Sequence, residues 1–280
     1  MWSRNRANLY IRDAMADFHP DPKAFLSPPR QGSIYRQKLE CTHLIGFGSG
    51  AAAGAVTPFA DVTSWSFDGV DGELNIPDHA DWTLGGGTGN FNLECWLFLL
   101  TPFTGEDYVF VHFQDNDNRW FLCIYANGSI QFYANLANVA QVNFTSSAGV
   151  VVASTWVHLA VIRGWNGNAN DWAITGNGIA VGTATDTSAI PDHTSPLYIA
   201  QRGSDEAYMN ANIDEIRISN VARWTTDFST PTEQYTSDAN TSLLIHGSEA
   251  VGGGTFTDSG NTGHTVSVLG GATQDTVVYR

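Results

Sequence analysis

The chain has 280 residues, of which 42% are hydrophobic and 12% aromatic. This content is enough to build a hydrophobic core, and it excludes a globally disordered chain. Charged residues make up only 15% and the formal net charge is −15. The abundance of Gly, Asn, Thr and Ser is typical of short strands joined by turns, not of helices.

Charge is distributed unevenly along the chain. Residues 1–60 carry a net charge of +3, whereas residues 61–280 contain no lysine and carry −18. An acidic domain repels nucleic acid, so DNA or RNA binding by residues 61–280 is disfavoured. The asymmetry indicates that the two parts meet different partners, although solubility alone also explains the negative charge.

Residues 1–45 are predicted to form an irregular, extended arm, because four prolines interrupt residues 20–29. We expect this arm to anchor the protein on an acidic surface of a larger assembly, with a disordered end as the alternative. The basic side chains that would anchor it are Arg4, Arg6, Arg12, Arg30, Arg36 and Lys38. Residues 46–60, rich in Gly and Ala, are predicted to be a linker. The sequence shows no signal peptide and no apolar run of 18 residues, so no membrane insertion is expected.

From residue 64 the pattern changes to short apolar runs separated by turn signals. The predicted strands are 65–67, 73–76, 91–100, 108–113, 120–125, 130–134, 141–144, 156–163, 172–175, 178–181, 197–201 and 211–219. Pairs such as Asn127-Gly128 and Asn177-Gly178 predict hairpins between neighbouring strands. A dozen short strands with hardly any helical pattern predict an all-β fold, either a sandwich or a barrel.

Four segments of this region resemble the ordered motifs of a known family. They are residues 66–77 (SFDGVDGELNIP), 91–97 (FNLECWL), 156–163 (WVHLAVIR) and 213–219 (IDEIRIS). In this order they are similar to motifs of laminin-G-like domains of the concanavalin A-like lectin/glucanase superfamily, the first to the opening signature and the last to the closing strand. The resemblance implies that residues 61–240 form an all-β, two-sheet antiparallel jelly-roll sandwich of the concanavalin A-like type.

Residues 222–241 and the segments that follow resemble laminin-G-like repeats in virion proteins of tailed phages. This resemblance implies a head decoration or tail-fibre component that is assembled in the host cytoplasm, released by lysis and homo-oligomeric on the particle. Its partners would be other virion proteins and a host-surface glycan. Residues 241–280 are expected either to fold back as edge strands of the sandwich or to pair with a neighbouring subunit.

The sequence lacks the motifs of a hydrolase. An enzyme of this fold would resemble the laminarinase-type glucanases, whose Glu-x-Asp-x-x-Glu strand supplies two carboxylates about 5 Å apart. That pattern is absent here. Asp214 and Glu215 are adjacent, so on a regular strand they would point to opposite faces. We therefore expect a non-enzymatic protein, with a free carbohydrate-binding module and a glycan depolymerase as the alternatives.

Two kinds of binding site are expected in the sandwich. Asp68 and Asp71, in one predicted turn, are candidate ligands of a structural calcium ion, since hard cations prefer carboxylate oxygens. The family resemblance implies that Asp214 lies near them and joins this site. The alternative is ordinary turn formation. A glycan site is expected where aromatic rings stand beside polar side chains. Its candidate residues, on or beside neighbouring strands, are His112, Gln114, Asn116, Trp120, Tyr125 and Tyr133. The alternative for each aromatic residue is a place in the core.

Overall fold

The computed structural model describes residues 63–100, 105–203, 207–247 and 252–275. Every described residue belongs to one compact unit of the chain, Ala51–Arg280. The predicted arm (1–45), its six basic residues and the linker (46–60) lie outside the described residues. No helix in the described ranges is long and apolar enough to cross a membrane.

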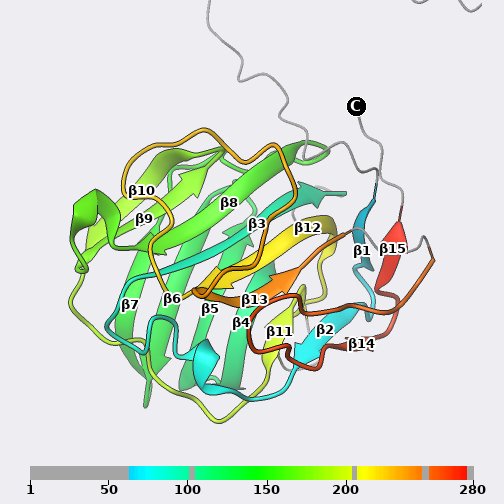
Figure 1. Ribbon diagram of the computed structural model, residues 1–280, viewed down its shortest axis with the longest axis horizontal. Helices are drawn as coiled ribbons and strands as arrows, with labels where there is room; N and C mark the ends of the chain where they lie inside the picture. Colours follow the sequence, from blue (N-terminus) through cyan, green and yellow to red (C-terminus); the bar gives the residue numbers. More distant parts are fainter. Residues whose placement is uncertain (1–62, 101–104, 204–206, 248–251, 276–280) are drawn as a thin grey trace, which may run out of the picture. The chain divides into compact units, whose positions relative to one another are not determined.

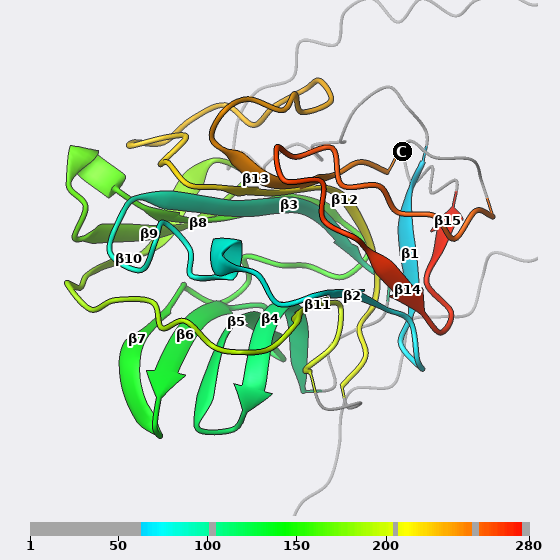
Figure 2. The same cartoon turned by 60° about the horizontal axis from the view of Figure 1, so that its bottom comes forward.

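Two antiparallel sheets pack face to face (Figure 1 and Figure 2). Sheet A contains, in spatial order, β10 (Ile179–Thr185), β9 (Asp171–Gly176), β8 (Trp156–Arg163), β3 (Phe91–Leu99), β12 (Asn210–Ser219), β1 (Ser64–Asp68) and β15 (Thr273–Asp275), with β13 (Thr241–Ile245) also paired to β12. Sheet B contains β14 (Ser267–Leu269), β2 (Glu73–Ile76), β11 (Leu197–Ile199), β4 (Glu106–Asp115), β5 (Asn118–Tyr125), β6 (Ile130–Leu136) and β7 (Val139–Thr145). Two short 3-10 helices, η1 (Ala80–Trp82) and η2 (Trp165–Gly167), lie in the connections. The prediction of an all-β, two-sheet jelly-roll sandwich is confirmed.

Each of the twelve predicted strands overlaps a strand of the structure, and three more strands lie in residues 241–275. β13 pairs with β12, β14 with β2 and β15 with β1. In the described residues all three pairings are formed within one chain. Pairing of this region with a neighbouring subunit stays the alternative prediction. Both sheets are therefore completed by strands from the end of the chain.

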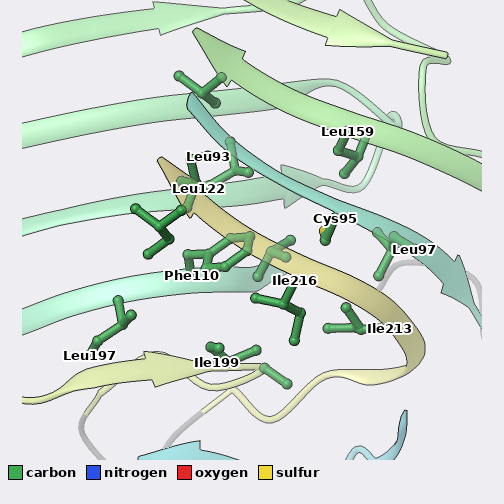
Figure 3. Packing of buried hydrophobic residues seen from close by; sticks show 14 of the residues in the cluster. Leu93, Cys95, Leu97, Phe110, Leu122, Leu159, Leu197, Ile199, Ile213 and Ile216 are labelled. Atoms are coloured by element: carbon green, nitrogen blue, oxygen red, sulfur yellow. The ribbon is translucent and has the colours of Figure 1, made fainter. Parts of the chain in front are cut away.

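The core lies between the sheets and is built from alternate residues of each strand. On β3, Leu93, Cys95 and Leu97 point towards sheet B, where Phe110 and Leu122 meet them (Figure 3). These side chains are at most 1% exposed. Full burial of one such side chain stabilises a fold by about 1.5–3 kcal/mol. The alternation also means that the residues between them point to the outer face of sheet A.

The outer face of sheet A is covered by residues 220–240, which connect β12 to β13 and cross this sheet in both views (Figure 1 and Figure 2). Trp224 and Phe228 of this segment stack on each other, with ring centroids 3.8 Å apart, and both pack against the ring of His158. Polar residues on the outer side of β3 and β8 are therefore buried: Glu94 and His158 are both 0% exposed.

β12 contains a bulge at its centre. Its pairing with β3 shifts between Asp214 and Arg217, and Glu215 has a left-handed φ of 49°. At the same point the neighbour of β12 on its other edge changes from β1 to β13. A bulge turns one residue out of the regular alternation and increases the local twist. It thus allows one long strand to pair with two short ones in succession.

Candidate functional site

The outer face of sheet B is the surface that points away from sheet A, and it carries a cluster of aromatic side chains. They come from β4, β5, β6 and β11 and are Tyr108, Phe113, Phe121, Tyr125, Tyr133 and Tyr198. In the described part of the chain, no segment crosses this face as residues 220–240 cross sheet A (Figure 2). Four of the six rings, those of Phe113, Tyr125, Tyr133 and Tyr198, consequently stay partly exposed.

Tyr133 is held in place by its cross-strand neighbours. It lies opposite Phe121 of β5 and opposite Asn143 of β7. The rings of Tyr133 and Phe121 stack with centroids 5.2 Å apart and planes 27° apart. Phe121 is only 5% exposed and also makes an edge contact with Tyr108 at 5.2 Å. Phe121 therefore supports the stack from within, and Tyr133 offers the accessible ring.

A chain of hydrogen bonds runs across the same face. The Tyr125 hydroxyl donates to Oε1 of Gln131, and Nε2 of Gln131 donates to Oδ1 of Asn143 at 2.8 Å. Burial raises the pKa of Tyr125 to about 12, so the hydroxyl stays protonated near neutral pH and keeps its role as a donor. The Asn143 side chain is exposed. Amide groups are thus fixed in place next to the ring of Tyr133.

Arginine side chains border the aromatic cluster on β5 and after β11. The guanidinium carbon of Arg119 lies 5.3 Å from the centroid of Phe121, and that of Arg202 lies 6.0 Å from the centroid of Tyr108. Nη1 of Arg119 also donates to Oδ1 of Asn116 at 3.0 Å. Cation–π contacts of this kind orient a guanidinium group at the border of the cluster.

This combination of groups suits a sugar. The C–H faces of a pyranose ring pack on aromatic rings, and its hydroxyls need fixed donors and acceptors beside them. The ring of Tyr133 supplies the first, and the amides of Gln131 and Asn143 supply the second. Because the groups stand on neighbouring strands of one sheet, they are already in position before a ligand arrives.

The six predicted glycan residues do not form one surface. Tyr125 and Tyr133 lie on the outer face of sheet B, and Asn116 lies next to it in the β4–β5 turn. Gln114 is exposed near the end of β4, and its Oε1 accepts from the backbone N of Thr194 at 3.1 Å. The remaining two residues, Trp120 and His112, are 0% exposed.

Trp120 and His112 belong to the interior. Nε1 of Trp120 donates to the carbonyl of Trp82 at 2.8 Å. Nε2 of His112 lies 2.9 Å from the carbonyl oxygen of Ser195. Burial, followed by the neighbouring His193, lowers the pKa of His112 to about 4. A glycan on the surface has no access to either side chain in this structure.

Sequence reasoning missed Phe121, Gln131 and Asn143. The signal for them was the strand alternation itself. If Tyr125 points outward, alternation turns Phe121 outward as well and Trp120 inward. The same rule pairs Gln131 with Tyr133 on β6. Asn143 follows only once β7 is known to pair with β6 in a fixed register.

Of the three predicted calcium ligands, Asp214 lies apart from Asp68 and Asp71, which share one turn. Asp68 pairs with Asn210 in the β1–β12 ladder, four residues before Asp214, a separation of about 13 Å along a strand. Oδ1 of Asp68 instead accepts the backbone N–H groups of Val70, Asp71 and Gly72 within 3.1 Å. Slight burial opposes these hydrogen bonds, which nevertheless lower the pKa of Asp68. One ion cannot contact both Asp68 and Asp214 here, and calcium binding stays a prediction.

Another group of ligand-type side chains does converge. His79, Asp81 and His264 place ligand atoms within 4.8 Å of one another, and in the described ranges no other group of three His, Cys, Asp or Glu does so. Nothing in the sequence pointed to it, because His264 is more than 180 residues from the other two.

The expectation that Asp214 and Glu215 point to opposite faces is wrong. Asp214 pairs with Trp96, whose ring packs on His158 on the outer side of sheet A. Glu215 has its partners on that side too: its Oε2 accepts from the backbone N of Tyr235 and its Oε1 lies 2.8 Å from Nδ1 of His246. The bulge at Glu215 is the physical reason, since a left-handed residue interrupts the alternation of a strand.

Comparison with known proteins identifies the fold family. A family profile described as the concanavalin A-like lectin/glucanases superfamily (Laminin_G_3) matches residues 68–227. Among curated proteins no significant match is found.

Three solved structures of low sequence identity align with this chain, and the first of them supports the same fold. A protein of Bacteroides ovatus, provisionally assigned as carbohydrate-binding, aligns with a TM-score of 0.56 and 15% identity. The alignment covers 78% of this chain and 60% of the Bacteroides ovatus protein. This chain therefore spans less than two thirds of the length of that protein. A heptameric SAP-like pentraxin of Limulus polyphemus aligns with a TM-score of 0.44 and 14% identity, over 75% of this chain and 96% of the pentraxin. The CBM40 domain of the Ruminococcus gnavus IT-sialidase aligns with a TM-score of 0.45 and 10% identity, over 57% of this chain and 92% of that domain. The chain belongs to the concanavalin A-like lectin/glucanase superfamily.

Proposed function

We propose that the protein binds carbohydrate, without catalysis, through the outer face of sheet B. The observation that carries the proposal is the half-buried ring of Tyr133, stacked on Phe121 and flanked by the amides of Gln131 and Asn143. This is a ring-and-amide pattern on a rigid sheet, the arrangement that sugar recognition needs. The carbohydrate-binding description of the similar Bacteroides ovatus protein supports the same ligand class.

The proposed absence of catalysis is supported by the burial and the contacts of the carboxylates on the outer side of sheet A. A retaining glycosidase needs two carboxylates that reach one sugar bond. Glu94 is 0% exposed and holds Arg217, while Glu215 is 1% exposed and holds the backbone of Tyr235. Both lie beneath residues 220–240, where a polysaccharide does not reach them.

A finer part of the proposal concerns where the domain works. We propose that it is displayed on a tailed-phage virion, as a head decoration or tail-fibre component, and that the basic arm (1–45) anchors it to other virion proteins. The phage resemblance of residues 222–241 and the change from +3 to −18 along the chain support this assignment. The ligand would then be a host-surface glycan, bound by homo-oligomers that leave the cell by lysis.

Glycan binding is tested by screening the untagged protein on an array of bacterial surface polysaccharides, then measuring affinity for the best ligand by calorimetry. Tyr133→Ala is expected to weaken binding by about 10-fold or more, since one stacking contact contributes ~0.5–1.5 kcal/mol beyond its area. Ile179→Ala is the matched control, because Ile179 is 52% exposed on β10 of sheet A. Equal affinities for the two variants would refute the assignment of the face.

Two further measurements test the anchoring role of residues 1–60 and the absence of catalysis. Deleting residues 1–60 should abolish incorporation into particles and leave glycan affinity unchanged. Normal incorporation of the truncated protein would exclude the arm as the anchor. A reducing-sugar assay on the bound polysaccharide should show no turnover. Turnover that is lost in Glu94→Gln or Glu215→Gln, while that variant keeps the glycan affinity of the wild type, would establish an enzyme.

A further inference from the structure

Two histidines and one aspartate meet at the edge of the sandwich, on segments far apart in the sequence. His79 and Asp81 lie at the start of η1, and His264 lies in the connection that leads to β14. Oδ2 of Asp81 is 3.2 Å from Nδ1 of His79 and 3.1 Å from Nε2 of His264. One carboxylate oxygen thus stands between two imidazole rings.

These separations match those of ligands on a tetrahedral metal ion. Zinc lies about 2.0–2.1 Å from nitrogen and oxygen ligands, so two of them at a tetrahedral angle are about 3.3 Å apart. Two of the three distances between ligand atoms, 3.2 and 3.1 Å, are already close to this value. The third, between the two imidazoles, is at most 4.8 Å. It can shorten by rotation of His79, whose side chain is 44% exposed.

The neighbouring side chains hold the other two ligands firmly. Thr262 donates its hydroxyl to Oδ2 of Asp81 at 2.9 Å. Oδ2 of Asp258 accepts from the backbone N of His264 at 2.7 Å, and the His264 ring packs on Trp82 with centroids 4.6 Å apart. Supporting hydrogen bonds of this kind orient metal ligands before the ion arrives.

His79 exchanges one contact when an ion binds. Its Nδ1 accepts the backbone N–H of Asp81 at 3.2 Å and lies 3.2 Å from Oδ2 of Asp81. A neutral imidazole has a single lone pair on its unprotonated nitrogen, so coordination of an ion by Nδ1 replaces this hydrogen bond.

From this geometry we infer that His79, Asp81 and His264 bind a divalent transition-metal ion, and that the ion joins the connection before β14 to η1. Two imidazoles and one carboxylate suit zinc, cobalt or nickel and do not suit calcium, which prefers oxygen ligands. With three protein ligands, a tetrahedral ion keeps one position for water on the exposed side of His79. The inference is independent of glycan binding on sheet B.

The experiment uses untagged full-length protein, freed of metal with a chelator and titrated with ZnCl2 at pH 7.5 in a calorimeter. One ion per chain is expected to bind, and Co2+ is expected to give the strong visible absorption of a four-coordinate site. His79→Gln should weaken zinc binding by at least about 100-fold, since loss of a mere supporting residue already costs 10–100-fold. Zinc should raise the melting temperature of the wild type but not of this variant.

Asp78→Asn is the matched control, because Asp78 neighbours His79 and its side chain is also 44% exposed. It should bind zinc like the wild type. His264→Gln provides a second test from the opposite segment, checked for folding by circular dichroism. The inference is overturned if the wild type shows no saturable binding, or if His79→Gln and Asp78→Asn bind zinc equally. In the first case the cluster is a hydrogen-bonded His–Asp–His arrangement without a metal.

Discussion

Arg217 donates from Nε to Oε1 of Glu94 at 2.7 Å, on the outer side of sheet A beneath residues 220–240. The guanidinium carbon of Arg217 also lies 4.0 Å from the ring centroid of Tyr235, which belongs to that covering segment. Nε2 of His158 is 3.2 Å from Oε2 of Glu94 and 2.8 Å from the Tyr235 hydroxyl. Burial opposes ionisation of Glu94, but His158 and Arg217 outweigh it and lower its pKa. The covering segment is thus tied to the sheet by a charged, hydrogen-bonded cluster.

Glu94→Gln should lower the free energy of unfolding by about 3–5 kcal/mol, because it leaves the buried charge of Arg217 without its counterion. Urea unfolding followed by tryptophan fluorescence measures the loss. Asp238→Asn is the contrasting variant, since Asp238 is 46% exposed although Arg223 holds it with two hydrogen bonds of 2.8 Å. That change should cost no more than about 1 kcal/mol. Similar losses in both variants would contradict the role of burial.

The stability should fall as the pH falls from about 6.5 to about 4, because His112 resists protonation in the folded state. Its pKa is lowered to about 4 by burial and by His193, whereas in the unfolded chain it takes up a proton near 6.5. The stability that neutral His112 gives to the folded state is therefore fully present above pH 6.5 and is lost as the pH falls towards 4. It amounts to about 2–3 kcal/mol between pH 7.5 and 4.5. Urea unfolding of chelator-treated protein at both pH values tests this. His112→Gln should show a correspondingly smaller difference, and an unchanged one would exclude His112 as the source.

Trp120→Phe should reduce stability and leave glycan affinity unchanged. The indole is buried between the sheets, and its loss leaves the Trp82 carbonyl without its 2.8 Å donor. An unsatisfied buried acceptor costs about 1–3 kcal/mol. Unfolding and calorimetric binding are measured on the same preparation. A selective loss of glycan affinity would show that Trp120 acts in recognition, contrary to its position.

Gly178→Ala should loosen the covering segment. Gly178 has a φ of 79° in the β9–β10 turn, and a Cβ there would collide with the carbonyl oxygen of Phe228, whose N–H donates to the Gly178 carbonyl at 2.9 Å. Gly167→Ala is the control, because Gly167 has a φ of 75° and a Cβ added there would meet no other atom within 4 Å. Both substitutions should lower the free energy of unfolding by about 1–2 kcal/mol, because each places an alanine in a left-handed backbone conformation. Only Gly178→Ala should speed proteolytic cleavage within residues 220–240. Equal cleavage rates would refute the docking role of this contact.

The amino-acid sequence by itself determined the fold class and most strands, because alternation and turn chemistry are local properties. Asn177-Gly178 predicts a hairpin, and both residues indeed have positive φ values of 50° and 79°. The sequence also indicated the family, since four motifs of that family occur in the expected order along the chain. What local patterns cannot supply is which long-range partner a strand acquires, as the placement of β14 and β15 beside β2 and β1 illustrates.

The candidate site depended on the tertiary structure. Trp120 and Tyr125 are equally aromatic in sequence, yet one fills the core and the other faces outward, because the sheet has one buried side and alternation assigns each residue to a side. The bulge at Glu215 reversed an inference that alternation alone would support. His264 reached Asp81 only because the end of the chain folds back across the sandwich. Short-range periodicity thus determined the strands, and the pairing of distant strands decided which side chains share a surface.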